Sequence, residues 1–280
     1  GLYATDSTRI FPIVTVVCNF TPPSGSQSPL LTLDETKTLF HEFGHALHKL
    51  FSKAKYNGTS HAEWDFVELP SQIMENWATE PEVLRFYARN YQTGDPIPDH
   101  LIRKIHASTL SNQGFATTEL AAAALLDMDL HSITEYKTID LDAFEQQVLY
   151  EKRGLIPQIA PRYRAPYFAH IFDGGYAAGY YGYLWAEVLD KDAFQIFTKS
   201  GDLFDREVAQ AFRSTILEPG GSSDGMTLFK KFMGREPQVL PMMVARGLAD
   251  PPAEDSTALI GGIGIVPDSI QTDSAKIKMP

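Results

Sequence analysis

The chain has 280 residues and a formal net charge of −11, from 24 lysine and arginine residues against 35 aspartate and glutamate residues. This acidic balance argues against nucleic acid and anionic membrane surfaces as partners, and it is compatible with a soluble enzyme. The single cysteine, Cys18, excludes a disulfide within the chain. No run of about eighteen apolar residues is present, which argues against a transmembrane helix.

The first thirty residues divide into a tail, a strand and a loop. Residues 1–10 are polar and unpatterned, so we expect a tail. Residues 11–20 are rich in β-branched side chains, which predicts a strand. Two interpretations of this strand stay open: a core strand, or an edge strand beside a cleft that pairs with an extended peptide. Prolines, glycine and serines in residues 21–29 predict a loop.

A helix is predicted next, and it contains the pattern H-E-x-x-H. Thr32 and Glu35 have the spacing of a capping box. Apolar residues then recur at helical spacing, which predicts a buried helix face. They are Leu39, Phe40, Phe43, Leu47, Leu50 and Phe51.

His41 and His45 lie four residues apart, so on a helix both imidazoles can reach one ion at about 2 Å, the usual zinc–nitrogen distance. Glu42 lies one step round the helix, where a general base for metal-assisted hydrolysis is needed. The alternative is an ordinary solvated helix. Two unpaired imidazoles and a carboxylate are costly beside a core, and a metal ion removes that cost.

A catalytic zinc ion needs a third protein ligand and an open position. Residues 64–77 look helical and carry several carboxylates, and Pro70 places Glu68 in or near the first turn. Spacing alone does not choose the third ligand among the four acidic residues of this region, which are Glu63, Asp65, Glu68 and Glu75.

Most of the remaining chain is predicted to be helical. Helical patterns cover residues 80–92, 99–132, 141–152, 184–199 and 205–217, and a last helix runs through residue 232. The alanine-rich residues 119–129 read as a packed helix without chemistry of its own. Three histidines have no partner spacing and are expected to be structural or exposed: His100, His106 and His131. His61 is expected to be exposed in a loop that borders the site.

Residues 174–183 contain four glycines and four tyrosines, which is unusual for a core. Glycines let a backbone turn or approach another chain closely, and tyrosine hydroxyls can hold a peptide carbonyl or an oxyanion. The alternative is an aromatic cluster packed under a loop. No glycine-rich phosphate-binding pattern is present.

Two stretches resemble the paired signatures of the thimet oligopeptidase and neurolysin family of zinc peptidases. The signatures HEFGHxxH and DFVExPSQxxExW stand at residues 41–48 and 65–77. The resemblance runs from about residue 11 to 248 and is strongest to the bacterial peptidyl-dipeptidases. It implies that His41, His45 and Glu68 bind one zinc ion and that Glu42 is the catalytic base.

The same resemblance assigns roles to the glycine–tyrosine segment. It implies that Tyr183 stabilises the oxyanion, and that His170, Tyr176 and Tyr180 contact the substrate backbone. The interval from His170 to Gly174 matches the bacterial peptidyl-dipeptidases and is one residue longer than in the mammalian members.

The resemblance also implies the architecture: a mainly α, zincin-like catalytic domain with a small β element, half of a two-part peptidase with a deep channel. Family members are more than twice as long, so the N-terminal half of the same protein is expected to complete the channel. We expect a catalytic domain over residues 11–248 and a flexible tail over 249–280. We expect the cytoplasm; the periplasm stays open, because any N-terminal signal would lie outside this chain.

The implied reaction is zinc-dependent hydrolysis of peptide bonds in short peptides, with release of C-terminal dipeptides. The alternatives are a general oligopeptide endopeptidase and a zinc-binding fragment that is inactive without its N-terminal half. Dipeptide release requires a group that binds the substrate's terminal carboxylate, and Arg162 and Arg164 are candidates. Both arginines could instead pair with acidic residues. Glu75, two helical turns beyond Glu68, is the candidate to orient a ligand imidazole.

Overall fold

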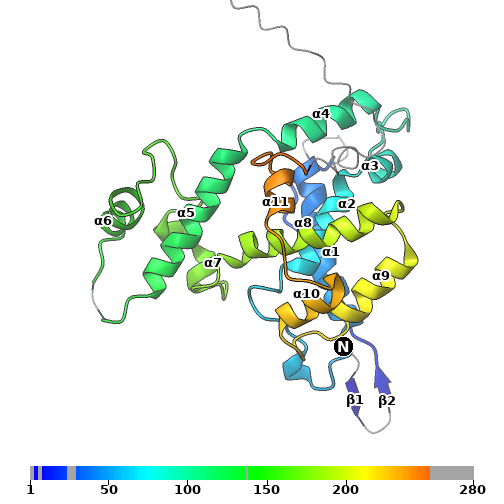
Figure 1. Cartoon of the computed structure of the whole chain (residues 1–280), viewed down its shortest axis with the longest axis horizontal. Helices are drawn as coiled ribbons and strands as arrows, with labels where there is room; N and C mark the ends of the chain where they lie inside the picture. Colours follow the sequence, from blue (N-terminus) through cyan, green and yellow to red (C-terminus); the bar gives the residue numbers. More distant parts are fainter. Residues whose placement is uncertain (1–2, 6–7, 24–29, 137, 253–280) are drawn as a thin grey trace, which may run out of the picture.

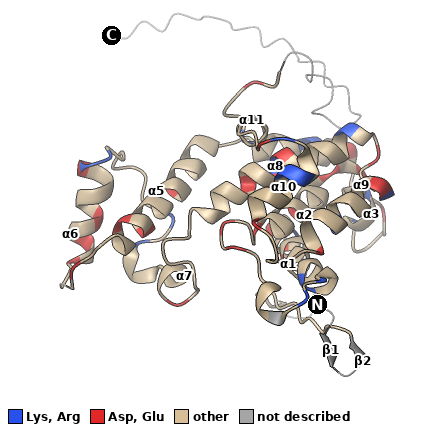
Figure 2. Cartoon of the chain, turned by 60° about the horizontal axis from the view of Figure 1, so that its bottom comes forward, with Lys and Arg blue, Asp and Glu red and all other residues tan. Residues whose placement is uncertain are grey.

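The structure is a computed structural model that describes residues 3–5, 8–23, 30–136 and 138–252. It is mainly helical, as predicted. The predicted tail at 249–280 lies largely outside the described residues. Among the described residues, no helix combines the length and the apolar character that crossing a bilayer requires. Acidic and basic residues are interspersed along the helices (Figure 2).

The only strands in the described part of the chain are not where the sequence predicts them. β1 (Tyr3–Thr5) and β2 (Thr8–Ile10) form an antiparallel hairpin within the segment expected to be an unpatterned tail. The prediction of a strand at residues 11–20 is wrong. Exposure alternates along that segment, as along an extended chain, but no neighbouring described segment supplies a ladder of hydrogen bonds.

Helix α1 (Leu33–Phe51) begins with the predicted capping box. The Glu35 N–H donates to Thr32 Oγ1 at 3.1 Å, and the Thr32 N–H donates to Glu35 Oε2 at 2.8 Å. The predicted apolar stripe spans two faces of the helix, and only one of them is covered. Phe40, Leu47 and Phe51 pack against the main core. The other face is partly exposed, which corrects the expectation of a uniformly buried stripe: Leu39, Phe43 and Leu50.

Helix α2 (Leu69–Thr79) crosses α1 at a point of very close approach. A Cβ atom added to Gly44 would lie 2.2 Å from the Pro70 carbonyl oxygen and 2.6 Å from the Ser71 Cα atom. Glycine is therefore required at this crossing. The helix starts at Leu69, because residues 64–68 form turns instead of the predicted first helical turns.

Shorter helices follow, and several predicted helices are interrupted. The predicted helix at 80–92 ends at Tyr87, and the one at 99–132 breaks at Asn112, which has a φ of 55°. These elements are α3 (Pro81–Tyr87), α4 (Asp99–Thr109), α5 (Gln113–His131), α6 (Leu141–Glu145) with its π-helical continuation η2 (Gln146–Glu151), and α7 (Ala169–Phe172); 3-10 turns lie at η1 (Asn57–Thr59) and η3 (Ala165–Tyr167).

The C-terminal helices complete the body that surrounds α1 and α2 (Figure 1). They are α8 (Gly182–Ser200), α9 (Arg206–Phe212) with its π-helical continuation η4 (Arg213–Leu217), α10 (Gly225–Met233) and α11 (Leu240–Ala245), the last of which the sequence does not predict. The main core lies between α2, α8, η4 and α10 and includes Leu69, Ile73, Leu189, Ile216 and Phe229.

Helix α5 extends away from this body towards α6 (Figure 1). Its alanines face two smaller cores: Ala122 packs with Leu126 and Leu149, while Ala123 and Ala124 pack with Phe168 and Ile171. Small side chains on both faces let α5 approach its neighbours closely, which explains why this helix shows little amphipathic pattern.

Candidate active site

The imidazoles of α1 converge on a carboxylate from the start of α2. His41 Nε2 lies 3.2 Å and His45 Nε2 lies 3.3 Å from Glu68 Oε2. The two rings are 4.9 Å apart and nearly perpendicular. One ligand atom from each residue can be chosen so that all three lie within 4.8 Å of one another. Two imidazole nitrogens and one carboxylate oxygen form a ligand set that suits zinc.

The Glu68 side chain is buried, with 2% of its surface exposed, and hydrogen bonds fix its position. Ser71 Oγ donates to Glu68 Oε2 at 2.8 Å, and the Tyr176 hydroxyl donates to Glu68 Oε1. Burial alone would raise the pKa of Glu68, but hydrogen bonds from His41 and His45 hold it well below its usual range. This carboxylate is therefore charged and fixed where a metal ligand is required.

Glu75 contacts the other nitrogen of a proposed ligand. His41 Nδ1 lies 2.7 Å from Glu75 Oε1. If Nδ1 donates there, the Nε2 lone pair of a neutral His41 faces the Glu68 oxygen, and two acceptors meet. A bound cation resolves this conflict, and so does a second proton on the ring. Burial alone would lower the pKa of His41, but the hydrogen bonds with Glu68 and Glu75 raise it to about 10. Doubly protonated, the ring bridges Glu68 and Glu75; once Nε2 gives up its proton, the same atoms form a donor set that fits a divalent metal ion.

Glu42 is half-buried and follows His41 on α1. No described residue makes a hydrogen bond or ion pair with its side chain, so both oxygens can accept a proton or a hydrogen bond. Its charge is among those that raise the pKa of the Tyr183 hydroxyl, so the two groups are close enough to interact. It also contributes, after burial, to the raised pKa of Cys18. Residues 11–20 therefore pass near Glu42.

Tyr183 lies in an aromatic cluster beside the histidines and Glu68. Its ring stacks on Tyr176 at 5.0 Å and lies 5.1 Å from Tyr180 and 6.4 Å from His170. Burial, followed by the Glu68 charge, raises the pKa of Tyr183 to about 12. The hydroxyl therefore stays protonated at neutral pH and can donate a hydrogen bond. The structure thus brings His170, Tyr176, Tyr180 and Tyr183 together.

The glycine–tyrosine segment is anchored by a residue that the sequence analysis missed. Asp127 of α5 is fully buried; its Oδ1 accepts from the Ala178 N–H and its Oδ2 from the Tyr180 N–H, both at 2.9 Å. Ala178 has a φ of 53°, an uncommon conformation that these bonds help to hold. His131 Nδ1 lies 2.7 Å from Asp127 Oδ1. A charged residue inside an alanine-rich helix, four before a histidine, was the available signal.

Trp64 closes one side of the cluster. Its ring lies 4.7 Å from the Tyr176 ring. A Cβ atom on Gly175 would lie 2.9 Å from the Trp64 ring, so the glycine at this position, with a φ of 84°, lets the loop pass the tryptophan.

The two arginine candidates lie in different surroundings. Arg164 pairs with Asp142 at 2.9 Å and also with Glu145, so it already has carboxylate partners. Arg162 is half-exposed and lies 3.5 Å from Glu119. It also interacts with Tyr180, whose pKa burial raises and Arg162 lowers. Arg162 is therefore connected to the aromatic cluster, whereas Arg164 is tied to α6.

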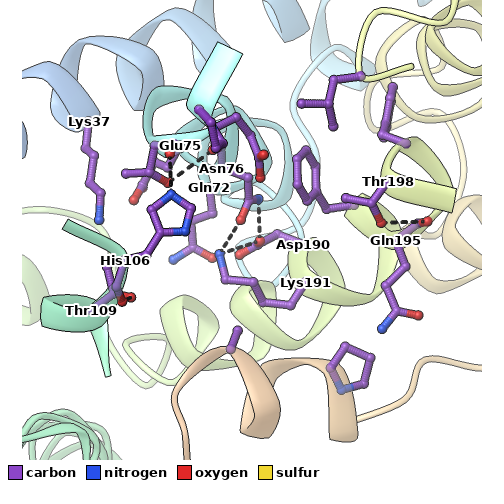
Figure 3. A pocket seen from close by; sticks show the side chains of 18 of the residues that line it. Lys37, Gln72, Glu75, Asn76, His106, Thr109, Asp190, Lys191, Gln195 and Thr198 are labelled. Carbon is purple, nitrogen blue, oxygen red and sulfur yellow. Dashed lines mark hydrogen bonds and ion pairs between the residues drawn. The ribbon is translucent and has the colours of Figure 1, made fainter. Parts of the chain in front are cut away.

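A cavity of about 830 Å³ lies on the Glu75 side of α2 (Figure 3). Its lining comes from α1, α2, α3, α4, α5, α8 and α11 and includes Lys37, Glu75, Asn76, Asp190 and Lys191.

The sequence matches a known protein family. The sequence model of Peptidase family M3 matches residues 1–248, including the ten residues read above as a tail. Dipeptidyl carboxypeptidase of Escherichia coli K12 is 45% identical over 254 residues, which is 89% of this chain and 37% of that protein. Oligopeptidase A of the same organism is 43% identical, covering 85% of this chain and 35% of that protein.

A more distant relative is saccharolysin of Saccharomyces cerevisiae, which is 34% identical and covers 83% of this chain and 33% of that protein. The chain thus spans about a third of the length of the relatives it matches.

Proposed function

Because the chain belongs to peptidase family M3, we propose that it is the catalytic region of a zinc peptidase that cleaves short peptides and releases C-terminal dipeptides. The observation that carries this proposal is the convergence of His41, His45 and Glu68, with Glu42 and Tyr183 beside them. We assign residues 11–248 to this region and expect it to act in the cytoplasm.

His41, His45 and Glu68 would hold the zinc ion, and Glu75 would orient the His41 imidazole by accepting from Nδ1. When bound, zinc supplies a Lewis acid that polarises the scissile carbonyl and lowers the pKa of a nearby water molecule. Glu42 would accept the proton of the attacking water and then deliver it to the leaving amine nitrogen.

Tyr183 would donate its hydroxyl proton in a hydrogen bond to the oxyanion that forms from the carbonyl. The high pKa of this hydroxyl supports a donor role, because it stays protonated. Tyr180, Tyr176 and His170 would contact the substrate backbone. Tyr176 already donates to Glu68, so its main effect should be on the position of that ligand.

Release of dipeptides requires recognition of a free terminal carboxylate. Arg162 is the better candidate of the two arginines, because Arg164 is already engaged by Asp142 and Glu145. The identity to a dipeptidyl carboxypeptidase favours this specificity, although an oligopeptidase is nearly as similar. General oligopeptide cleavage is therefore the second candidate function.

We propose that the N-terminal half of the same protein forms the other wall of a substrate channel, since the chain spans only about a third of its relatives. Without that half, the chain could bind zinc and remain inactive. Assays of activity should therefore supply the preceding part of the protein, whereas zinc binding can be measured on this chain alone.

The test compares one short peptide as the free acid and as the C-terminal amide. Dipeptide release predicts that amidation strongly lowers kcat/KM, and equal values would leave the general oligopeptidase in its place. Glu42→Gln should keep zinc and lose about 10²- to 10⁴-fold in turnover. Glu151→Gln, which changes an exposed carboxylate on η2, is the matched control and should keep full activity. Near-normal turnover of Glu42→Gln would refute the mechanism.

A further inference from the structure

Helices α2 and α8 are joined by three polar side chains beside the cavity described above. Asn76 Nδ2 donates to Asp190 Oδ1 at 2.9 Å, and Lys191 Nζ donates to Asn76 Oδ1 at 2.7 Å and to Asp190 Oδ1 at 3.0 Å (Figure 3). The Asp190 side chain is 1% exposed and that of Lys191 is 23% exposed. We call Asn76, Asp190 and Lys191 the clamp.

The clamp holds α2 at the turn that serves the candidate metal site. Asn76 directly follows Glu75, the partner of His41 Nδ1. One turn earlier, Gln72 Nε2 donates to the Tyr183 carbonyl oxygen at 3.0 Å. Residues four apart on a helix share a face, so these two ties fix α2 against α8 at successive turns. Helix α2 directly follows Glu68 and carries Glu75, and helix α8 carries Tyr183.

The charge of Lys191 is surrounded by carboxylates. Burial alone would lower its pKa, but Asp190, Glu187 and Glu75 together raise it above the usual value, so the ammonium stays charged. Burial raises the pKa of Asp190 to about 6, and Lys191 opposes that rise. Lys191 and Glu75 line the same cavity, and the Glu75 charge is among those that raise the pKa of Lys191, so the ammonium attracts the Glu75 carboxylate.

A purely structural ion pair on the same helix provides a comparison. Asp192 is fully buried, and Arg235 donates to both of its oxygens at 2.6 Å. Asp192 also accepts from the Gln238 N–H at 2.9 Å. This pair joins α8 to the segment after α10, and among the described residues no residue of α1 or α2 makes a hydrogen bond or ion pair with it. Loss of either Lys191 or Arg235 leaves a buried carboxylate short of a partner, but only Lys191 is connected to Glu75.

We propose that Lys191 is a positioning residue for the metal site: through Asn76 it fixes the turn of α2 that presents Glu75 to His41, and its charge keeps the Glu75 carboxylate at that place. This inference rests on the proposed zinc site and names a determinant of its affinity that lies outside the ligands and their direct partners.

The test measures zinc affinity by competition with a chelating dye, on the 280-residue chain and without reference to activity. Loss of a direct partner of a ligand weakens metal binding about 10- to 100-fold, which is the expectation for Glu75→Ala. Lys191→Met acts one contact further away and should weaken zinc binding roughly 3- to 10-fold. Arg235→Met should lower the thermal midpoint similarly and leave zinc affinity at the wild-type value.

A second variant guards against misfolding. Asp190→Asn combined with Lys191→Met removes the uncompensated carboxylate while an amide oxygen can still accept from Asn76, and it should also bind zinc more weakly than wild type. Wild-type zinc affinity in the double variant, or an equal loss in Arg235→Met, would overturn the inference. Failure of the wild-type chain to bind zinc would instead refute the proposed function, so the two failures are distinguishable.

Discussion

In the part of the chain that the structure describes, two buried carboxylates contact histidine: one contacts two imidazoles and the other contacts one. Glu68 is 1% exposed and contacts His41 and His45, whereas Asp127 is 0% exposed and contacts His131. Each group uses helical spacing of four residues, between the two histidines in one case and between aspartate and histidine in the other. Burial and composition therefore do not distinguish them.

The hydrogen-bond partners of the two carboxylates distinguish the two groups. Asp127 accepts from two backbone N–H groups and from one imidazole, so an acceptor is surrounded by donors and nothing further is needed. At Glu68, two imidazole nitrogens are directed at one oxygen, and Glu75 accepts a hydrogen bond from the other ring nitrogen of His41. A carboxylate and two imidazoles that converge on one point form a ligand set for a metal ion, whereas backbone N–H groups that converge on a carboxylate form a structural anchor.

The largest expected effect separates the two groups by metal content. His45→Ala removes one of three proposed ligands and should reduce bound zinc from one ion per chain to almost none after dialysis. His131→Ala is the matched change in the other group and should retain the ion. Elemental analysis of both purified variants measures this. Full zinc content in His45→Ala would refute the ligand assignment.

The next effect concerns the Tyr183 hydroxyl, on the first turn of α8 directly after the loop that Asp127 anchors. Tyr183→Phe should lower kcat about 10²- to 10³-fold, as expected for loss of one oxyanion donor, with a smaller change in KM. Zinc content should not change, because Tyr183 is not a ligand. Steady-state kinetics in the presence of the N-terminal half gives the answer, and an effect on KM alone would assign this residue to substrate binding.

Asp127→Ala tests the anchor itself. It leaves the N–H groups of Ala178 and Tyr180 without their acceptor, and each unsatisfied buried donor is costly, so the free energy of unfolding should fall by about 2–3 kcal/mol. Urea unfolding monitored by circular dichroism measures the loss. Asp127→Asn keeps an oxygen acceptor and should be milder. Unchanged stability in the alanine variant would show that the loop holds its conformation without this residue.

The smallest effect involves a third carboxylate, Glu80, which contacts neither a histidine nor a backbone N–H group through its side chain. No described residue makes a hydrogen bond or ion pair with its side chain, and burial, followed by repulsion from Glu82, raises its pKa from 4.5 to about 7. The folded state thus holds more protons than the unfolded state between these values, and stability falls as pH rises through this window.

Glu80→Gln should remove this dependence. We expect the variant to be more stable than wild type by about 1 kcal/mol at pH 8, with little difference near pH 4. Thermal midpoints at the two pH values provide the measurement. An equal shift at both would attribute the gain to packing and not to ionisation.

Local spacing was enough to predict the parts of the site that lie on one helix. The capping box and the pairing of His41 with His45 depend on neighbours within a few residues, and the structure shows both. Glu68 could not be chosen from spacing, because its reach to the histidines depends on how α2 crosses α1. Only the resemblance to a family singled it out.

Features set by distant partners were missed. Asp127 was read as part of an inert helix because its acceptor role depends on a loop about fifty residues further along the chain. The strand predicted at residues 11–20 has suitable side chains, but a strand also needs a partner, and the described chain does not provide one.

The crossing at Gly44 bears on how the H-E-x-x-H pattern itself should be read. The two variable positions of the pattern are usually treated alike, yet Phe43 is 47% exposed while Gly44 is pressed against the backbone of α2. Any side chain at position 44 would push Glu68 away from the histidines. In a saturation library, position 44 should therefore be as intolerant as a ligand, whereas position 43 should accept many residues. Of the two positions that the motif leaves variable, only position 43 should therefore tolerate substitution.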